Sequence, residues 1–410
     1  MAHARPQFLK MHEQDLIRKV HENGGRIYLV GGYVRDELLH RVPHDKDYTV
    51  TGLEIAQFER MFPEAQRTGH AFPVYRLPIE GRMAEIAFAR SEYKQGQGYR
   101  GFVVTFDAQT HIEADLYRRD TTVNSMAREL PTGKLIDPFG GQRDLQNHIL
   151  RATSKHFAED PVRALRAARQ AAVLAFSIAP QTLKAMANCR LELLQEPQER
   201  IFKELTKALA TEHPSLFFQA LRDACLWVNI FPELAEVNAS NYAWQNFLRV
   251  ADEIASYTQN IDVRFASLAF SLGYHPERIY DLQRGQQRLA MWHARMTLPN
   301  AWRKAAMLCM QIGACCQINS DVQPNFEEIA DILLQITKAP WCLRDMQALI
   351  KAWYGKVPLW LAEDWQNKLC SMSHQIPKDL QGKAISIWLR KKRAEMLAKL
   401  WRLCNGQAIH

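Results

Sequence analysis

The stretch LVGGYVRDELLHRVPHDKDYTVT, residues 29–51, predicts how the N-terminal part of this 410-residue chain folds. It opens inside a short apolar run that predicts a buried strand, breaks at Gly31 and Gly32, and continues as a helical pattern over residues 33–39. A strand that turns through glycines into a helix presents free backbone N–H groups and the positive end of a helix, which attract phosphate. Arg35 adds a guanidinium in the first turn.

Two aspartates, Asp45 and Asp47, come just before a second predicted strand at residues 48–50. Residues i and i+2 of a strand point to the same face, so the two carboxylates would repel each other unless cations lay between them. Alone, each feature would be a plain turn or a pair of solvated turn residues. A phosphate cradle and a carboxylate pair within one stretch instead predict Mg²⁺-assisted phosphoryl or nucleotidyl transfer.

Composition narrows the class of protein. With 410 residues, of which 47% are hydrophobic, the chain should form two to four domains with a real core. The formal net charge of +8 favours a polyanionic partner.

No apolar run approaches a bilayer span and residues 1–10 lack a signal-peptide core, so we expect a cytoplasmic protein with no membrane partner. The eight cysteines form no CxxC pair, which predicts reduced, mostly buried thiols rather than a zinc or redox site.

The predicted elements divide the chain into an α+β head and an all-α remainder. Helices are predicted at residues 54–62 and from residue 112 to 127, and the polar, glycine-rich residues 91–101 predict a mobile loop. Strands are predicted at residues 26–30, 48–51, 72–77, 83–89, 102–106 and 134–136. Beyond residue 143 the pattern is almost entirely helical and ends in a basic amphipathic stretch at residues 383–403. That stretch is either a solvated helix face or an RNA contact.

A second motif follows at residues 115–127, DLYRRDTTVNSMA. Arg119 would neutralise triphosphate charge, and Asn124, five residues further on, would hydrogen-bond a sugar. Taken alone, the segment would be a surface helix with an arginine pair. It supports a nucleotide site only in combination with the glycine turn and the aspartate pair.

A third segment, EDPVRALR at residues 159–166, places Asp160 and Arg163 at i and i+3, on one face if the segment is helical. An intrahelical ion pair is the simplest interpretation. The functional alternative is a protein template for a base: the aspartate accepts from the exocyclic amine of cytosine or adenine, and the arginine donates to the adjacent ring acceptor. Uracil and guanine present a carbonyl instead of the amine, so an acceptor would face an acceptor. Arg166 would reach the same nucleotide.

Together these motifs resemble those of the class II tRNA nucleotidyltransferases, the CCA-adding enzymes, a family that includes bacterial poly(A) polymerases. The family patterns are LVGGxVRD followed by DxD, RRDxTxNA (with Ser125 here in place of alanine), a DPFGG-type motif at residues 137–145, and EDPxRxLR. The resemblance implies three domains: a polymerase-β-like nucleotidyltransferase head at residues 1–140, a helical neck with the base-selecting motif at 141–230, and a helical body and tail at 231–410.

The resemblance also implies an activity. The chain would add CCA to the 3′ end of tRNA without a nucleic acid template, using CTP and ATP and releasing pyrophosphate, and it would contact the acceptor end and the elbow of tRNA. Mg²⁺ is the implied cofactor, held by both aspartates of the DxD motif. The resemblance assigns the phosphates to Gly32, Arg35 and Arg119, and the base to Asp160, Arg163 and Arg166.

Three alternatives to this function stay open. Poly(A) polymerases usually carry a basic signature with His-Val soon after the aspartates, whereas residues 67–75, RTGHAFPVY, look like the tRNA enzymes. Members that add only CC have a shortened flexible loop, and the length of residues 91–101 favours full CCA addition over CC or A alone. A catalytically silent tRNA-binding module is the third alternative, and the intact DxD argues against it.

The second half departs from its family subgroup at one place. Relatives of this length carry an HD phosphohydrolase motif, VRFxxLxHDLGKG, where residues 263–273 of this chain read VRFASLAFSLG. Phe270 and Ser271 thus replace the His-Asp pair, and a phenyl ring and a hydroxyl cannot substitute for imidazole and carboxylate as metal ligands. We therefore expect the helical body to survive without metal chemistry.

Overall fold

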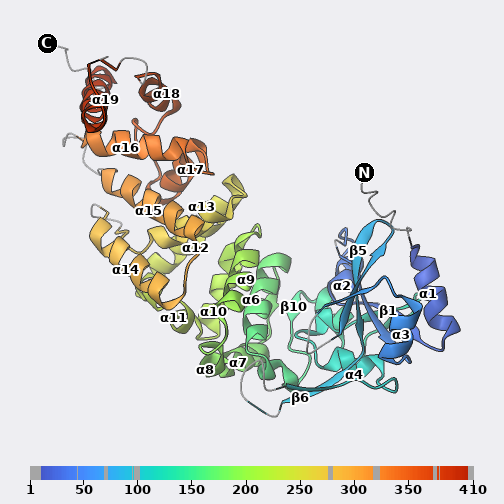
Figure 1. The fold of residues 1–410 in the computed structure, drawn as a ribbon. Helices are drawn as coiled ribbons and strands as arrows, with labels where there is room; N and C mark the ends of the chain where they lie inside the picture. Colours follow the sequence, from blue (N-terminus) through green and yellow to red (C-terminus); the bar gives the residue numbers. More distant parts are fainter. Residues whose placement is uncertain are drawn as a thin grey trace, which may run out of the picture. The chain divides into compact units, whose positions relative to one another are not determined.

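The computed structural model describes residues 11–43, 45–68, 73–94, 96, 102–275, 280–316, 324–372, 376–377 and 379–404. The chain separates into two compact units (Figure 1). Unit 1 comprises Met1–Glu204 and Ala220–Leu226, and unit 2 comprises Leu205–Gln219 and Trp227–His410. The division into head, neck and body at residues 140 and 230 stays a prediction.

A mixed sheet of seven strands organises unit 1. The strand order is β3 (Gln66–Thr68), β4 (Val74–Ile79), β5 (Arg82–Phe88), β2 (Asp47–Thr51), β1 (Arg26–Val30), β8 (Ala127–Leu130) and β9 (Leu135–Ile136). Strands β2 and β5 pair in parallel and every other pair in this sheet is antiparallel. The strands expected around residues 26–30 and 48–51 are therefore confirmed, and they lie next to each other in the middle of the sheet.

The larger of two apolar clusters on this sheet, among the described residues, continues beyond residue 140. Leu16 and Val20 of helix α1 (Glu13–Glu22), together with Phe58 of α3 (Ile55–Met61), are fully buried against the strands. Burial of each such side chain stabilises the fold by about 1.5–3 kcal/mol. Leu145 and Leu174, which belong to the expected neck, pack in the same core. The turn between β1 and α2 (Gly32–Leu38) is thus anchored on both sides by buried structure.

Two expectations for this unit are wrong. The helix expected over residues 112–127 is only α4 (Ile112–Tyr117); a 3-10 turn η2 (Thr122–Asn124) and strand β8 follow it. The reason is that polar side chains of this segment bond to nearby groups instead of allowing the helix to continue, as where the Thr122 hydroxyl donates to Asp144.

Residues 91–94 are not a loop but strand β6 (Ser91–Lys94), paired antiparallel with β7 (Phe102–Thr105) in a separate two-stranded sheet. We call this pair the β6–β7 arm. Of the remainder of the expected loop, residue 96 is described, and residues 95 and 97–101 lie outside the described residues. So do residues 69–72, which include His70 of the segment compared with poly(A) polymerases.

The rest of unit 1 is mainly helical, with one two-stranded parallel sheet of β10 (Ile149–Leu150) and β11 (Ser177–Ile178). Its helices are α5 (Gly141–Gln146), η3 (Lys155–Glu159), α6 (Val162–Leu174), α7 (Pro180–Asn188), α8 (Arg190–Leu193) and the first part of α9 (Gln198–Leu209). Helix α10 (Pro214–Asp223), like α9, contributes residues to both units.

Unit 2 is helical, as expected. Its further elements are α11 (Trp227–Ile230), η4 (Pro232–Asn238), α12 (Asn241–Tyr257), α13 (Ile261–Phe270), α14 (Leu282–Arg295), α15 (Asn300–Cys315), α16 (Phe326–Thr337), α17 (Leu343–Tyr354), α18 (Glu363–Ser371) and α19 (Lys383–Cys404) (Figure 1). All eight cysteines of the chain are free, but the expectation of mostly buried thiols is wrong, because four are exposed: Cys225, Cys342, Cys370 and Cys404. Within the described residues, none of the helices has the length and apolarity that crossing a membrane requires.

Candidate nucleotide-binding site

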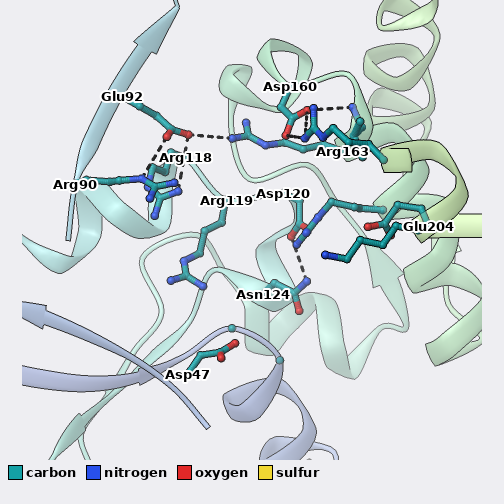
Figure 2. A pocket seen from close by; sticks show the side chains of 16 residues that line it. Asp47, Arg90, Glu92, Arg118, Arg119, Asp120, Asn124, Asp160, Arg163 and Glu204 are labelled. Carbon is teal, nitrogen blue, oxygen red and sulfur yellow. Dashed lines mark hydrogen bonds and ion pairs between the residues drawn. The ribbon is translucent and has the colours of Figure 1, made fainter. Parts of the chain in front are cut away.

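A cavity of about 470 Å³ in unit 1 collects most of the residues that the sequence singled out (Figure 2). Seven basic and five acidic side chains line it. Figure 2 shows Asp47 toward one end, Asp160 and Arg163 toward the other, and Arg119 and Asn124 between them. A lining of this kind suits a polyanionic ligand with a polar heterocycle better than an apolar one.

The glycine turn forms one end of the cavity. Gly31 has φ of 68°, a left-handed value that favours glycine, and its carbonyl accepts from the backbone N–H of Arg35 at 3.2 Å. A Cβ on Gly31 would lie 3.0 Å from Nη1 of Arg119. Glycine is therefore needed here for the backbone geometry and to let the Arg119 guanidinium lie over the turn, beside Gly32, which also lines the cavity.

Asp47 is the acidic residue at this end. It begins β2 and pairs in parallel register with Glu85 on β5. Asp47 is open to solvent on one side, but the protein around it partly desolvates the carboxylate and so raises its pKa; the negative charges of Glu85 and Asp45 raise it further, while Arg119 opposes the change. Three carboxylates thus interact electrostatically around this strand end. Glu85 was missed from the sequence because only strand pairing brings it opposite Asp47.

Asp45 corrects one detail of the sequence argument. Because β2 begins at Asp47, Asp45 lies before the strand, is exposed and does not line the cavity. The described residues contain no cluster of three or more His, Cys, Asp or Glu side chains arranged to hold a metal. Hard carboxylate oxygens nevertheless fit Mg²⁺, which is usually bound through one or two carboxylates together with substrate phosphates and water.

Glu13 of α1 fixes the strand that carries Asp47. Lys46 Nζ lies 2.8 Å from Glu13 Oε2, and the Tyr48 hydroxyl donates to Glu13 Oε1. Burial, then the bond to Glu13, raises the pKa of Tyr48 well above its ordinary value, so this hydroxyl stays a donor. Side chains alternate in direction along a strand, and Lys46 and Tyr48 flank Asp47 in the sequence. Glu13 therefore bonds to the face of the strand opposite to the Asp47 side chain.

Arg35 does not occupy the place expected of it. Its Nε donates to Asp36 at 2.8 Å and its Nη1 donates to Asn124 Oδ1 at 2.8 Å, and it does not line the cavity. Asn124 in turn donates from Nδ2 to Asp120 at 3.1 Å. Arg35 therefore positions Asn124, which does line the cavity, rather than facing a ligand itself.

A buried carboxylate, Asp115, holds two of the lining arginines. Arg118 Nε lies 3.0 Å from its Oδ1, and Arg119 Nη2 lies 2.9 Å from its Oδ2. Burial alone would raise the pKa of Asp115, but the two guanidinium groups outweigh it and lower the pKa to about 2. Asp115 was assigned no role in the sequence analysis, because its contacts with the two guanidinium groups depend on the fold.

The expected base-reading pair does meet at the cavity, but not as a helical pair. Helix α6 begins at Val162, so Asp160 precedes the helix, and its Oδ1 accepts from the backbone N–H of Val162 at 3.2 Å. Proline at position 161 sets this start, because its ring suits the first positions of a helix. Arg163 lies in the first turn of α6, and both side chains line the cavity.

Both members of this pair have charged partners that the sequence did not indicate. Arg200 of α9 lies 2.9 Å from Oδ2 of Asp160, and Glu92 of β6 lies 3.2 Å from Nη2 of Arg163. The backbone carbonyl of His156 also accepts from Arg163.

Arg166, the third residue assigned to the base, is held by Asp120 at 2.8 Å. Asp120 also accepts from Gln170 and Asn124. Burial would raise the pKa of Asp120, but the bonds, above all those to Arg166, keep it well below the ordinary value. This buried carboxylate therefore links the helix of the base-reading pair to the turn that carries Asn124.

This chain is similar to several known proteins. A family model described as the Poly A polymerase head domain matches residues 27–151, and one described as the probable RNA and SrmB-binding site of polymerase A matches residues 175–237. A multifunctional CCA protein of Stenotrophomonas maltophilia (strain R551-3) is 40% identical over 303 residues, which are 68% of this chain and 74% of the relative. One of Haemophilus ducreyi (strain 35000HP / ATCC 700724) is 45% identical over 217 residues, 52% of each chain.

Among solved structures, the Bacillus stearothermophilus CCA-adding enzyme in complex with CTP superposes with a TM-score of 0.65 at 23% identity, covering 97% of this chain and 93% of that one. At this identity the likeness shows that the fold is shared. The relatives identified by sequence carry the assignment further, because one of them is covered over 74% of its length at 40% identity. The chain belongs to the family of the CCA-adding tRNA nucleotidyltransferases.

Proposed function

We propose that this chain restores the CCA end of tRNA, transferring CMP and AMP units from CTP and ATP to the 3′ hydroxyl and releasing pyrophosphate, with no nucleic acid template. The observation that carries the proposal is that one cavity of unit 1 holds Asp47 beside the Gly31–Gly32 turn and also Asp160 with Arg163. A phosphate end and a base-reading end in one cavity match the two parts of a nucleoside triphosphate.

At the phosphate end, Asp47 and Asp45 would hold Mg²⁺, whose charge would lower the pKa of the attacking hydroxyl and offset the charge of the triphosphate. Arg119 lies over the glycine turn and would bind the same phosphates through the part of its guanidinium not used by Asp115. Asn124, held by Arg35, would bond the sugar. These contacts orient the α-phosphorus for in-line attack.

At the base end, Asp160 would accept from the exocyclic amine of cytosine or adenine, and Arg163 would donate to the neighbouring ring nitrogen. Arg166, held in place by Asp120, would support the same nucleotide. Because both correct bases carry an amine next to a ring acceptor, a single pair serves for CTP and ATP.

The proposal extends to the remainder of the chain. It includes a head, neck and body divided at residues 140 and 230, a location in the cytoplasm, and a contact between the basic tail and the tRNA elbow. The support for the tail is that α19 carries the run Arg390, Lys391, Lys392 and Arg393 on a helix with a single buried residue, Leu397. Phosphate contacts by such residues would add affinity that falls with salt.

The decisive experiment incubates the purified protein and Mg²⁺ with tRNA that ends before CCA, supplies each NTP singly and together, and sequences the products. We expect CCA when CTP and ATP are both present and no product from UTP or GTP. Addition of CC alone or A alone would identify a partial enzyme, and runs of A would identify a poly(A) polymerase. tRNA binding without any incorporation would show that the chain is a silent binding module.

A further inference from the structure

The two base-reading side chains are each tethered by a charged residue from another element of unit 1, and neither tether is part of the motif that contains the pair. We propose that Arg200 and Glu92 are positioning residues that set base selectivity. Arg200 fixes the carboxylate of Asp160, Glu92 fixes the guanidinium of Arg163, and the pair then presents one pattern of acceptor and donor to the incoming base. The inference rests on the proposed function and deepens it.

The first tether joins α9 to the segment before α6. Nη2 of Arg200 lies 3.1 Å from Oδ1 and 2.9 Å from Oδ2 of Asp160. Nη1 of the same guanidinium lies 2.5 Å from Glu196 Oε2, whose side chain is 2% exposed. Arg200 is thus clamped between a buried carboxylate and Asp160, and it holds Asp160 together with the backbone N–H of Val162.

The second tether joins the β6–β7 arm to α6. Nη2 of Arg163 lies 3.2 Å from Glu92 Oε1, and the two side chains are 9% and 6% exposed. The same carboxylate lies 3.4 Å from Arg90 and 3.8 Å from Arg118. Glu92 is therefore the acidic group among three guanidinium groups at this wall, and it determines where Arg163 lies relative to the arm.

These tethers leave hydrogen-bonding capacity for a ligand. A guanidinium carries five N–H donors, and within the described residues Arg163 uses one for Glu92 and one for the backbone carbonyl of His156. A carboxylate has about four lone-pair positions, and among the residues that the structure describes Asp160 accepts from Arg200 and from one backbone N–H. Both side chains line the cavity, so the unused groups are available to a base there.

Fixed orientation matters because rejection of uracil depends on it. If the Asp160 carboxylate cannot turn or withdraw, its oxygen faces the carbonyl oxygen of uracil, which is also an acceptor. Neither oxygen then forms a hydrogen bond. A loosened carboxylate or guanidinium could move away and let a water molecule fill the gap. Loss of a tether should therefore cost selectivity more than it costs turnover with the correct nucleotide.

The test measures kcat and KM for CTP and UTP on tRNA that ends before CCA, using the full-length chain. For Arg200→Gln and for Glu92→Gln we expect the ratio of kcat/KM for CTP to that for UTP to fall about tenfold, as for the loss of one charge-assisted hydrogen bond. The matched control is Arg169→Gln. It removes the 2.5 Å ion pair of Arg169 with Glu204, which also joins α6 to α9 but does not touch the base-reading pair, and it should keep the wild-type ratio.

A double-mutant cycle separates positioning from general damage. If Arg200 acts through Asp160, adding Arg200→Gln to Asp160→Ala should leave the CTP/UTP ratio of Asp160→Ala unchanged. The same holds for Glu92→Gln added to Arg163→Ala. A further drop of similar size in either double variant would show that the tether acts elsewhere and would overturn the inference.

Folding of each variant is checked by thermal melting. If Arg200→Gln has a lower melting temperature than the wild type, Glu196→Gln is used instead. It leaves Arg200 in place but weakens the interaction of its guanidinium with the Glu196 side chain. We expect a smaller fall in the CTP/UTP ratio of kcat/KM for this variant. Suppose that the wild-type chain adds CTP and ATP. If the variants then select CTP over UTP as well as the wild-type chain does, only this inference is overturned. A wild-type chain that adds neither nucleotide would overturn the proposed function and this inference with it.

Discussion

Two regions of the molecule, the start of β2 in unit 1 and the end of α13 in unit 2, carry the positions where the family patterns have metal-ligand residues, and they differ completely. At β2, Asp47 lines a charged cavity, opposite Glu85 and near Asp45. At α13, Phe270 is 0% exposed in the core of its unit. The first region keeps carboxylates together at an electrostatic cost, whereas the second has become apolar packing. Charged groups around a cavity and an apolar core thus occupy the two positions, and the predictions below test whether chemistry is confined to the first.

The packing around Phe270 shows how complete that change is. Its ring centroid lies 4.5 Å from that of Tyr280 and 5.6 Å from that of Trp353. A Cβ on Gly313 of α15 would come within 2.6 Å of the Phe270 ring, so a glycine in the facing helix makes room for it. The Ser271 hydroxyl donates to the Leu268 carbonyl at 2.6 Å. The phenyl ring has no lone pair to offer a metal, and a neutral serine hydroxyl does not replace a carboxylate as a metal ligand.

Removal of Asp47 should produce the largest effect. For Asp47→Ala we expect nucleotide incorporation with Mg²⁺ to fall by about a thousandfold or more, because the main carboxylate for the metal is lost. tRNA affinity should change little, since phosphate contacts elsewhere dominate it. Single-turnover incorporation and filter binding measure the two quantities. Asp45→Ala should act in the same direction, and near-normal incorporation by either variant would contradict the metal assignment.

Removal of Phe270 should affect stability instead. Phe270→Ala should lower the free energy of unfolding of unit 2 by about 3–5 kcal/mol, the usual cost of deleting a fully buried ring. Denaturant titration followed by tryptophan fluorescence measures it, because all ten tryptophans lie in unit 2. Leu359→Ala is the control, since this side chain is 54% exposed and should change stability by about 0.5 kcal/mol or less. Equal effects of the two variants would mean that the ring does not support the core.

Acid should distinguish the two regions further. The pKa of Asp115 is about 2 in the folded chain against an ordinary value of 3.8, so its ion pairs stabilise unit 1 fully above pH 3.8, by about 2 kcal/mol. That contribution is lost as the pH falls through 2. The stability difference between wild type and Asp115→Asn, measured by hydrogen exchange in residues 111–126, should therefore shrink from pH 5 to pH 2. The corresponding difference for Phe270→Ala should stay constant with pH, because no charge is involved.

The smallest expected effect is none at all. We expect no hydrolysis of 2′,3′-cyclic AMP with added Ni²⁺ or Mn²⁺, measured on the Asp45→Ala variant so that nucleotidyl transfer does not interfere. Metal hydrolases need several strong ligands that converge on the ion, and the phenyl ring of Phe270 and the neutral hydroxyl of Ser271 do not replace an imidazole and a carboxylate. Hydrolysis that a chelator abolishes would reveal a site built from the other histidines, such as His213, His275, His293 and His374, the last of which lies outside the described residues.

Much of the fold and site could be predicted from local pattern. The apolar run before Gly31, the alternation after Asp47 and the helical periodicity beyond residue 143 each depend on residues close in sequence, and the structure confirms the corresponding elements. Seven of the nine residues that the sequence analysis assigned to the site also line one cavity: Gly32, Asp47, Arg119, Asn124, Asp160, Arg163 and Arg166. Periodicity and motif spacing are properties of the chain itself, so they can be read before it folds.

The groups that hold these residues, and the choice of which residues face the cavity, follow from the packing of elements that are distant in sequence. Glu92 lies 71 positions from Arg163, and Arg200 lies 40 positions from Asp160, so no local pattern relates them. Arg35 carries the spacing of a phosphate ligand, yet its guanidinium is taken up by Asp36 and Asn124. A charged side chain bonds to whichever opposite charge the fold brings within about 3 Å. Sequence spacing can therefore name the charges of a site, but the packing of distant elements determines how they pair.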